Sequence, residues 1–171
     1  MLTIIGDTHG TDSHRLRGET HDAVREADHV LHTGDFTTEA VYEAIAAEAG
    51  ADTIAGSAPL TAVQGNNETP ALRERLPQKT TVDAEGIRFA LAHGHRHDET
   101  SLGLFARETE ADVVVVGHSH RPGIDERPYG LLVNPGSYAD PRRYRPAHAT
   151  VRAGTVELRT PDGAVLAEHT V

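Results

Sequence analysis

Five short segments of the chain carry side chains of the types that bind metal ions in proteins. They are Gly6-Asp7-Thr8-His9, Gly34-Asp35, Gly65-Asn66-Asn67-Glu68, His93-Gly94-His95 and Gly117-His118-Ser119-His120. Seven of these side chains offer only oxygen or imidazole nitrogen as donors, namely Asp7, His9, Asp35, Asn66, His93, His118 and His120. Such donors suit Mn, Fe, Ni, Zn or Co rather than Cu(I). One ion would use about four of them, whereas seven are expected for two ions that share a carboxylate and lie about 3.5–4 Å apart.

Taken singly, each segment has an explanation that involves no ligand. Gly-Asp and Gly-Asn-Asn are common in turns, Asp-x-His is a common loop pair, and His93 could be a hydrogen-bonded residue at a strand end. Gly-His-x-His is more specific, because side chains two residues apart on an extended segment point to the same side. The occurrence of all five segments in one chain, each behind a predicted strand, favours a metal site.

The elements that position these segments can be predicted from apolar runs and turn residues. Strands are expected at 2–5, 29–33, 60–64 and 113–116, a hairpin at 80–83 and 87–92, and helices at 19–27, 38–49 and 98–110, the last capped by Asp98. Short strands separated by turns follow Ile124, and we expect this tail to be antiparallel. Because ligands bind at the carboxyl ends of strands in an α/β sheet, the five segments should meet at one edge. The order predicts an α/β fold with a mixed sheet, or with two stacked sheets flanked by helices.

The ordered set of segments resembles the calcineurin-like metallophosphoesterase superfamily. The short length and Asn134-Pro135-Gly136-Ser137 resemble its small phosphodiesterase branch, the YfcE-like group. The resemblance implies a four-layer α/β/β/α sandwich of two mixed sheets flanked by helices (metallo-dependent phosphatase-like), here one domain over residues 1–171. It also implies two divalent cations, with Mn favoured and Ni, Fe, Co, Zn or Mg as alternatives. In such proteins Asp7, His9, Asp35 and His120 would bind the first ion, Asp35 would bridge, and Asn66, His93 and His118 would complete the second.

The function that follows is metal-dependent hydrolysis of phosphodiesters by in-line attack of a bridging hydroxide. Asp35, Asn66 and His93 are expected to be catalytic, and Asn67 and His95 are expected to contact substrate. Many family members have histidine where this chain has Asn67, and an asparagine cannot deliver a proton at neutral pH. We therefore expect a preference for esters with acidic leaving groups, such as nitrophenyl esters. The same ions would serve a phosphomonoesterase or a nuclease on short oligonucleotides, and a non-catalytic scaffold like the retromer subunit of this fold is a further alternative.

The composition of the chain limits the kinds of molecule that it is expected to bind. The chain has 171 residues and a net charge of 16 − 26 = −10, which argues against binding of long nucleic acid. Cysteine is absent, so disulfides and thiolate ligands are excluded. We expect no signal peptide, no membrane span, a cytoplasmic location and a small phosphoester as substrate, and a homo-oligomer stays open. Lys79 is the only lysine, which a high-salt cytoplasm or a GC-rich genome would each explain.

Some charged residues fall outside the ligand set. Arg142-Arg143-Tyr144-Arg145 is the one basic cluster, interpreted as a solvated loop or as a grip on an acidic substrate or a neighbouring subunit. His32 is expected close to the site. The histidines expected to be structural or on the surface are His14, His21, His29, His148 and His169.

Overall fold

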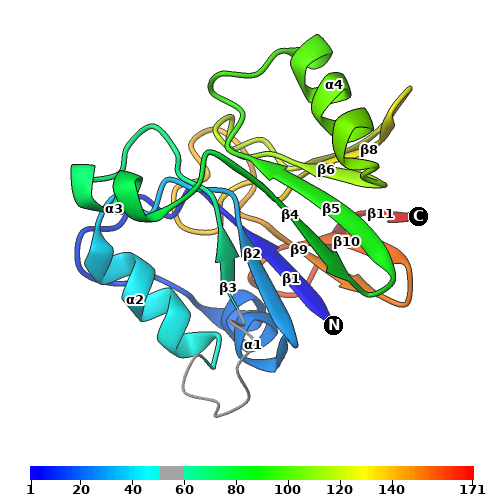
Figure 1. Ribbon diagram of the computed structural model, residues 1–171. Coiled ribbons are helices and arrows are strands. Elements are labelled where there is room, and N and C mark those ends of the chain that lie inside the picture. The colour runs from blue at the N-terminus through cyan, green and yellow to red at the C-terminus, as the bar shows by residue number, and fades with distance from the viewer. Residues whose placement is uncertain (51–59) are drawn as a thin grey trace.

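A computed structural model describes residues 1–50 and 60–171, and its strands form two sheets with helices on the outer faces (Figure 1). The helices are α1 (Gly18–Glu26), α2 (Glu39–Glu48), α3 (Pro70–Arg75) and α4 (Glu99–Thr109). The strands are β1 (Leu2–Ile5), β2 (His29–His32), β3 (Leu60–Ala62), β4 (Lys79–Ala84), β5 (Ile87–Ala92), β6 (Val113–Val115), β7 (Gly123–Arg127), β8 (Gly130–Asn134), β9 (His148–Arg152), β10 (Thr155–Arg159) and β11 (Val165–Thr170).

Both sheets are mixed, as predicted. The first has the order β11-β10-β9-β1-β2-β3, in which β1, β2 and β3 are parallel and β9, β10 and β11 are antiparallel. The second has the order β4-β5-β6-β8-β7, in which β5, β6 and β8 are parallel. The carboxyl ends of β1, β2, β5 and β6 therefore lead into the loops that carry the predicted ligands.

The prediction of an antiparallel tail is confirmed for β7 with β8 and for β9, β10 and β11, but β8 also pairs in parallel with β6, which was not predicted. After β6 the chain forms the edge strand β7, and β8 then inserts between β7 and β6. Burial explains this choice, because Leu131 and Val133 of β8 are buried, whereas Asp125, Glu126 and Arg127 of β7 are exposed and suit an edge. Helix α3 was not predicted, since it is only six residues long.

Three apolar layers hold the four structural layers together. Leu31, Phe89 and Val113 lie in the layer between the two sheets. Val30 and Val114 point to the opposite faces of their sheets and pack into the other two layers. The layer that contains Val30 lies beneath α1 and α2 and includes Val24, Val41 and Ile45. The layer that contains Val114 lies beneath α4 and includes Leu102, Phe105 and Ala106. Figure 1 shows α4 outside one sheet and α1 and α2 outside the other. Each central strand is thus buried on both faces, which leaves its end as the place for polar side chains.

Local signals set the ends of two helices. Thr38 caps α2 by accepting the Val41 N–H, and Asp98 caps α4 by accepting the Ser101 N–H at 2.8 Å, as predicted. Among residues 1–50 and 60–171, no helix has the length and apolar character needed to cross a membrane.

Candidate metal centre

The loops after β1, β2, β3, β5 and β6 bring the predicted ligands to one place. Two groups of donor atoms form there, Asp7 with His9 and His120, and Asp35 with His93 and His118. Within each group one ligand atom per residue lies within 4.8 Å of the others. The groups match the two halves that the resemblance implied, and Asn66 joins the second.

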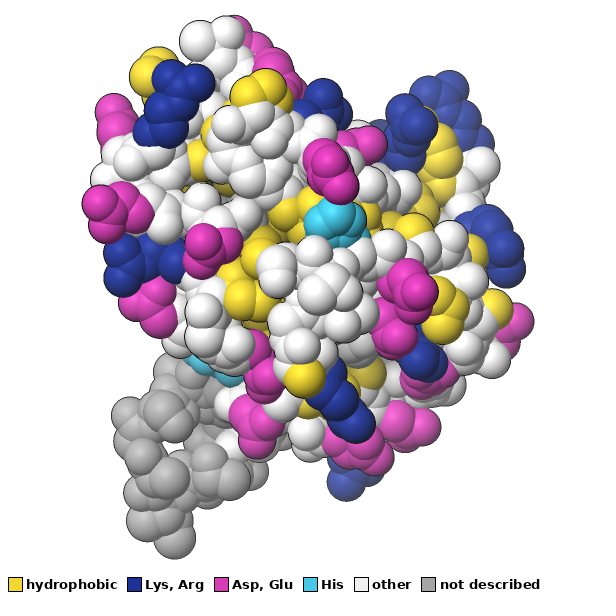
Figure 2. Space-filling view, turned by 90° about the vertical axis from the view of Figure 1, so that its right-hand side faces the viewer, with side chains coloured by type: hydrophobic (Ala, Val, Ile, Leu, Met, Phe, Trp, Pro, Cys, Tyr) yellow, Lys and Arg dark blue, Asp and Glu magenta, His cyan; other side chains and the backbone are white. Residues whose placement is uncertain are grey.

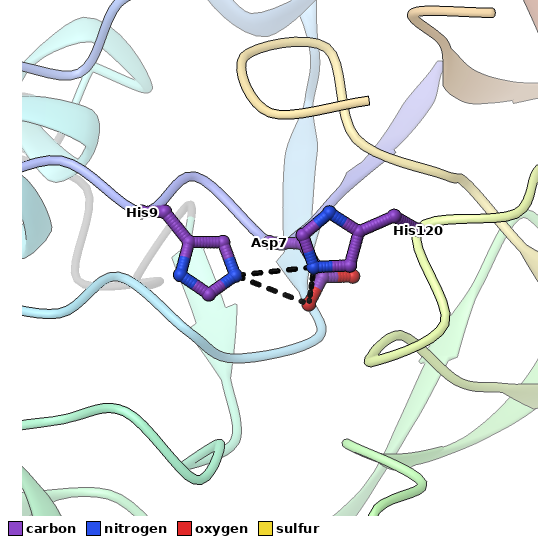
Figure 3. A group of neighbouring side chains, drawn as sticks. All are labelled: Asp7, His9 and His120. Atoms are coloured by element: carbon purple, nitrogen blue, oxygen red, sulfur yellow. Dashed lines mark hydrogen bonds and ion pairs between the residues drawn. The ribbon is translucent and has the colours of Figure 1, made fainter. Parts of the chain in front are cut away.

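The first group combines a carboxylate with two imidazoles (Figure 3). The Nε2 atoms of His9 and His120 are 3.2 Å apart, and Asp7 Oδ1 lies 4.0 Å and 3.6 Å from them. Two nitrogens that bind one ion at ~2.1 Å lie roughly 3.0–3.4 Å apart, depending on the angle between them. The observed separation is therefore that of neighbouring ligands. Asp7 Oδ2 is buried and has no hydrogen-bond partner among the described residues.

Asp35 lies between the two groups. Its Oδ2 atom is 3.4 Å from His9 Nε2 of the first group and 3.3 Å from His93 Nε2 of the second. The backbone N–H of Asn67 donates to Oδ1 at 2.9 Å, and its side-chain amide donates to Oδ2 at 2.7 Å. One carboxylate oxygen thus faces both halves of the site, which is the position required of a bridging ligand.

The second group contains a histidine in a fixed tautomer. His93 Nδ1 donates to the carbonyl of Thr33 at 2.7 Å, so the lone pair of a neutral ring lies on Nε2. That atom is 3.1 Å from Asn66 Oδ1, another acceptor, and close to Asp35. His118 is exposed and its ring centre lies 5.2 Å from that of His93. When the ring is neutral, these acceptors face one another, and a cation bound between them would stabilise the arrangement.

The donor chemistry fits divalent cations. His120 Nδ1 donates to the carbonyl of Asp140, so it too directs an Nε2 lone pair into the centre. Hydrogen bonds from the far ring nitrogen to a carbonyl are the usual support of metal-binding histidines. Oxygen and imidazole donors around an unpartnered buried carboxylate oxygen form two groups that could each hold a divalent cation.

Electrostatics indicate the same need for positive charge. Burial raises the pKa of Asp7 to about 7, with a further rise from the nearby Asp35 carboxylate. Burial lowers the pKa of His93, but the hydrogen bond and charge of Asp35 outweigh this and hold it above the ordinary value. Burial also raises the pKa of Asp35, yet the contacts with His93 and Asn67 bring it well below its usual range. The centre therefore favours a carboxylate at Asp35 and a cation beside it.

Five of the predicted ligands have a left-handed backbone, which sequence reasoning did not foresee: Asp7, His9, Asp35, His118 and His120 have φ between 47° and 66°. Gly65 and Gly117 contribute to the site because they have no side chain. A Cβ on Gly65 would lie 2.1 Å from Asp35 Oδ1, and one on Gly117 would lie 2.4 Å from Thr33 Oγ1. Non-glycine residues in this conformation are strained and persist where packing enforces them.

Three residues that support the ligands were not predicted to do so. Glu68 is buried, and its Oε1 accepts the N–H groups of Asp35 at 2.6 Å and Phe36 at 3.3 Å. Ser137 donates to the carbonyl of Asp7 at 2.7 Å. Thr33 supplies the carbonyl for His93. Glu68 and Ser137 both belong to motifs noted in the sequence, but their burial and their contacts cannot be predicted from it.

The two predicted substrate contacts lie beside the ligands. The ring of His95 has its centre 5.3 Å from that of His93 and 6.0 Å from that of His118, and its Nδ1 is buried without a partner among the described residues. Asn67 is hydrogen-bonded to Asp35, so its side chain orients a ligand, and contact with substrate stays a prediction for both residues. His32 lies one step farther out, within 3.0 Å of Thr8 Oγ1, and accepts the Gly34 N–H.

The remaining histidines lie outside the centre. His14 and His21 both approach Glu48, His29 contacts Thr61, and His169 lies near Glu126. His148 is fully buried and contacts Thr20.

Known phosphoesterases resemble this chain in both sequence and structure. The model of the calcineurin-like phosphoesterase superfamily domain matches residues 1–157. A "Probable metallophosphoesterase" of Methanothermobacter thermautotrophicus is 31% identical over 156 residues, covering 89% of this chain and 85% of that protein. Yfce, a phosphoesterase from E. coli, is similar in structure with a TM-score of 0.72 and 18% identity over 99% of this chain and 98% of that one.

Two further solved structures share the fold. An archaeal phosphodiesterase has a TM-score of 0.61 and 19% identity, with 99% of each chain covered. Vps29 of Entamoeba histolytica, complexed with Zn²⁺, has a TM-score of 0.73 and 21% identity over 99% of this chain and 97% of that one.

Proposed function

Because the chain belongs to the calcineurin-like phosphoesterase superfamily, whose members act on phosphate esters with divalent metals, we propose that it is a dinuclear phosphodiesterase. The observation that carries this proposal is the meeting of seven donors in two groups that share one oxygen of Asp35. Asp7, His9, Asp35 and His120 would hold one cation, and Asp35, Asn66, His93 and His118 the other. The absence of sulfur donors suits Mn, which we propose as the metal.

Two bound cations would supply hydroxide at neutral pH and neutralise charge on the phosphate. The residues of the chain fix the geometry for that chemistry. Asn67 and Glu68 hold Asp35 through its side chain and its backbone, and the carbonyls of Thr33 and Asp140 fix the rings of His93 and His120. Side chains locked in this way keep reacting groups within the narrow tolerance that catalysis requires.

Asn67 also limits the range of esters. Its amide is committed to Asp35 and carries no proton that it could transfer at neutral pH. The leaving group must then depart as an anion or take a proton from water. Esters with acidic alcohols or phenols are accordingly the proposed substrates.

The proposed substrate is small rather than a long nucleic acid. The net charge is −10. On the face seen in Figure 2, acidic side chains lie among the Lys and Arg side chains, and no broad basic stripe is present there. Long DNA or RNA needs clustered basic side chains along its phosphates.

A non-catalytic scaffold is the second candidate, because Vps29 structures share the fold. Zinc is present in one of them, so metal binding alone does not separate a scaffold from an enzyme. Turnover is the observation that does.

The test is hydrolysis of bis(p-nitrophenyl) phosphate and p-nitrophenyl phosphate after chelation and addition of Mn. We expect Mn-dependent activity, higher on the diester, and its loss in Asp35→Asn, which weakens both metal positions. Asp83→Asn is the matched control, because Asp83 is exposed on β4 and paired with Arg88. No turnover with Mn, Ni, Co, Mg or Zn would support the scaffold, and a fully active Asp35→Asn would refute the bridging role.

A further inference from the structure

The connection from β8 to β9 carries the basic cluster Arg142-Arg143-Tyr144-Arg145 and is fastened to the metal centre. Ser137 Oγ donates to the carbonyl of Asp7 and accepts the Asp140 N–H at 2.8 Å, while the carbonyl of Asp140 accepts from His120. Arg142 follows two residues later. The basic cluster therefore begins at the rim of the first ligand group.

Arg142 has a backbone conformation that its turn does not favour. The Tyr144 N–H donates to the carbonyl of Pro141 at 2.8 Å, which makes Arg142 the second residue of a tight turn. Its φ is 52°, a value at which such turns usually have glycine, asparagine or aspartate. The turn itself gives no reason for an arginine here, and strained residues of this kind cluster at functional sites.

The charge of Arg142 reaches the metal centre. Burial is the main influence on the pKa of Asp7, His9 and His118, raising the first and lowering the other two, and the positive charge of Arg142 contributes a lowering at all three. Arg142 is exposed and forms no ion pair with any residue in the described ranges. Arg142 is thus an exposed cation, two residues after the carbonyl that holds His120, and it is available to an anion.

The neighbouring arginine differs in this respect. The guanidinium of Arg143 lies over the ring of Tyr144, 5.3 Å from its centre, and its Nε donates to the Tyr144 hydroxyl at 3.2 Å. Arg143 is also exposed. It therefore provides a control of the same charge one residue away.

We propose that the guanidinium of Arg142 binds a non-bridging oxygen of the phosphate group at the rim of the metal centre, both in the ester and in released inorganic phosphate. This inference rests on the proposed function for the ester, but binding of inorganic phosphate tests it separately. Guanidinium is suited to the role, because its fork of donors matches two phosphate oxygens and stays charged at every working pH.

Arg142→Gly is the decisive variant, since glycine suits the left-handed backbone while the charge is removed. We expect it to keep or slightly raise the Tm, and to raise both KM for bis(p-nitrophenyl) phosphate and Ki for inorganic phosphate about tenfold, the scale of a lost charge-assisted hydrogen bond. The value of kcat should change much less. Arg143→Gly should leave KM and Ki at parental values.

Titration calorimetry of the Mn-loaded protein with inorganic phosphate keeps this result apart from the proposed function. If the parent hydrolyses no ester, the proposed function fails, but weaker phosphate binding by Arg142→Gly than by Arg143→Gly would still support the assignment. Equal affinities in the two variants, or no phosphate binding by the parent, would overturn it.

Discussion

Gly65→Ala should disable the metal centre by displacing Asp35. The added Cβ would lie 2.1 Å from Asp35 Oδ1 and 2.6 Å from its backbone nitrogen. An ordinary contact is about 3.4 Å or more, so the carboxylate and the backbone must separate by about 1 Å. The backbone at Gly65 is not left-handed, so alanine adds only a contact and no conformational strain of its own. A displacement of this size costs about 10²-fold in rate when it affects a positioned group, and the overpacking should cost about 1–3 kcal/mol of stability.

The measurement is kcat/KM for bis(p-nitrophenyl) phosphate together with the number of Mn ions bound per chain. Gly123→Ala is the control, because its Cβ would have Asp125 Oδ2 as its nearest contact at 3.6 Å, an ordinary distance. Thermal unfolding shows whether Gly65→Ala is folded at the assay temperature. A folded Gly65→Ala with parental kcat/KM and full Mn binding would refute the argument that Asp35 must be held at its observed position.

Two further predictions concern residues on and off the centre. Asn67→His should supply a proton donor, so the dependence of rate on leaving-group pKa should become flatter than in the parent; an unchanged slope would contradict this role. Burial, with a smaller effect of Arg159, lowers the pKa of His148 to about 4 in the folded protein, against 6.5 for the free side chain. The unfolded chain then binds more protons between these values, so stability is lost as pH falls, by about 2 kcal/mol from this residue between pH 7 and pH 5. Urea unfolding of parent and His148→Leu at both pH values should show this difference, and parallel losses in the two proteins would exclude it.

The donor side chains that meet in the structure could be predicted from the sequence because the relevant physics is local. An apolar run long enough for a strand and followed by a donor, with a glycine between them in four of the five segments, can be recognised without knowledge of the rest of the fold. The parallel arrangement of β1 and β2, and of β5 and β6, then brings those ends together. The fold class follows from the same pattern, since strands that are apolar on both faces need a layer on each side.

The features that were not predicted depend on distant contacts. β8 is parallel to β6 because the exposed residues of β7 belong at an edge, a preference that shows only when the whole sheet is considered. Glu68 contacts backbone N–H groups at Asp35 and Phe36, 33 and 32 residues away. No pattern within a window of a few residues contains that information.

The left-handed ligands connect the two kinds of observation. Each costs about 1–2 kcal/mol relative to an ordinary conformation, and five occur in one site. Short loops could not maintain these strained conformations alone. The loops are held in place because each begins at a strand that is buried on both faces. In β1, for example, Ile4 lies in the layer between the sheets and Ile5 lies in the layer beneath α1 and α2. The strands therefore provide the stability of the fold, whereas the backbone strain lies in the loops at their ends. Substitutions in the apolar layers should lower the free energy of unfolding first, whereas substitutions that relax a ligand loop should lower activity while the fold remains.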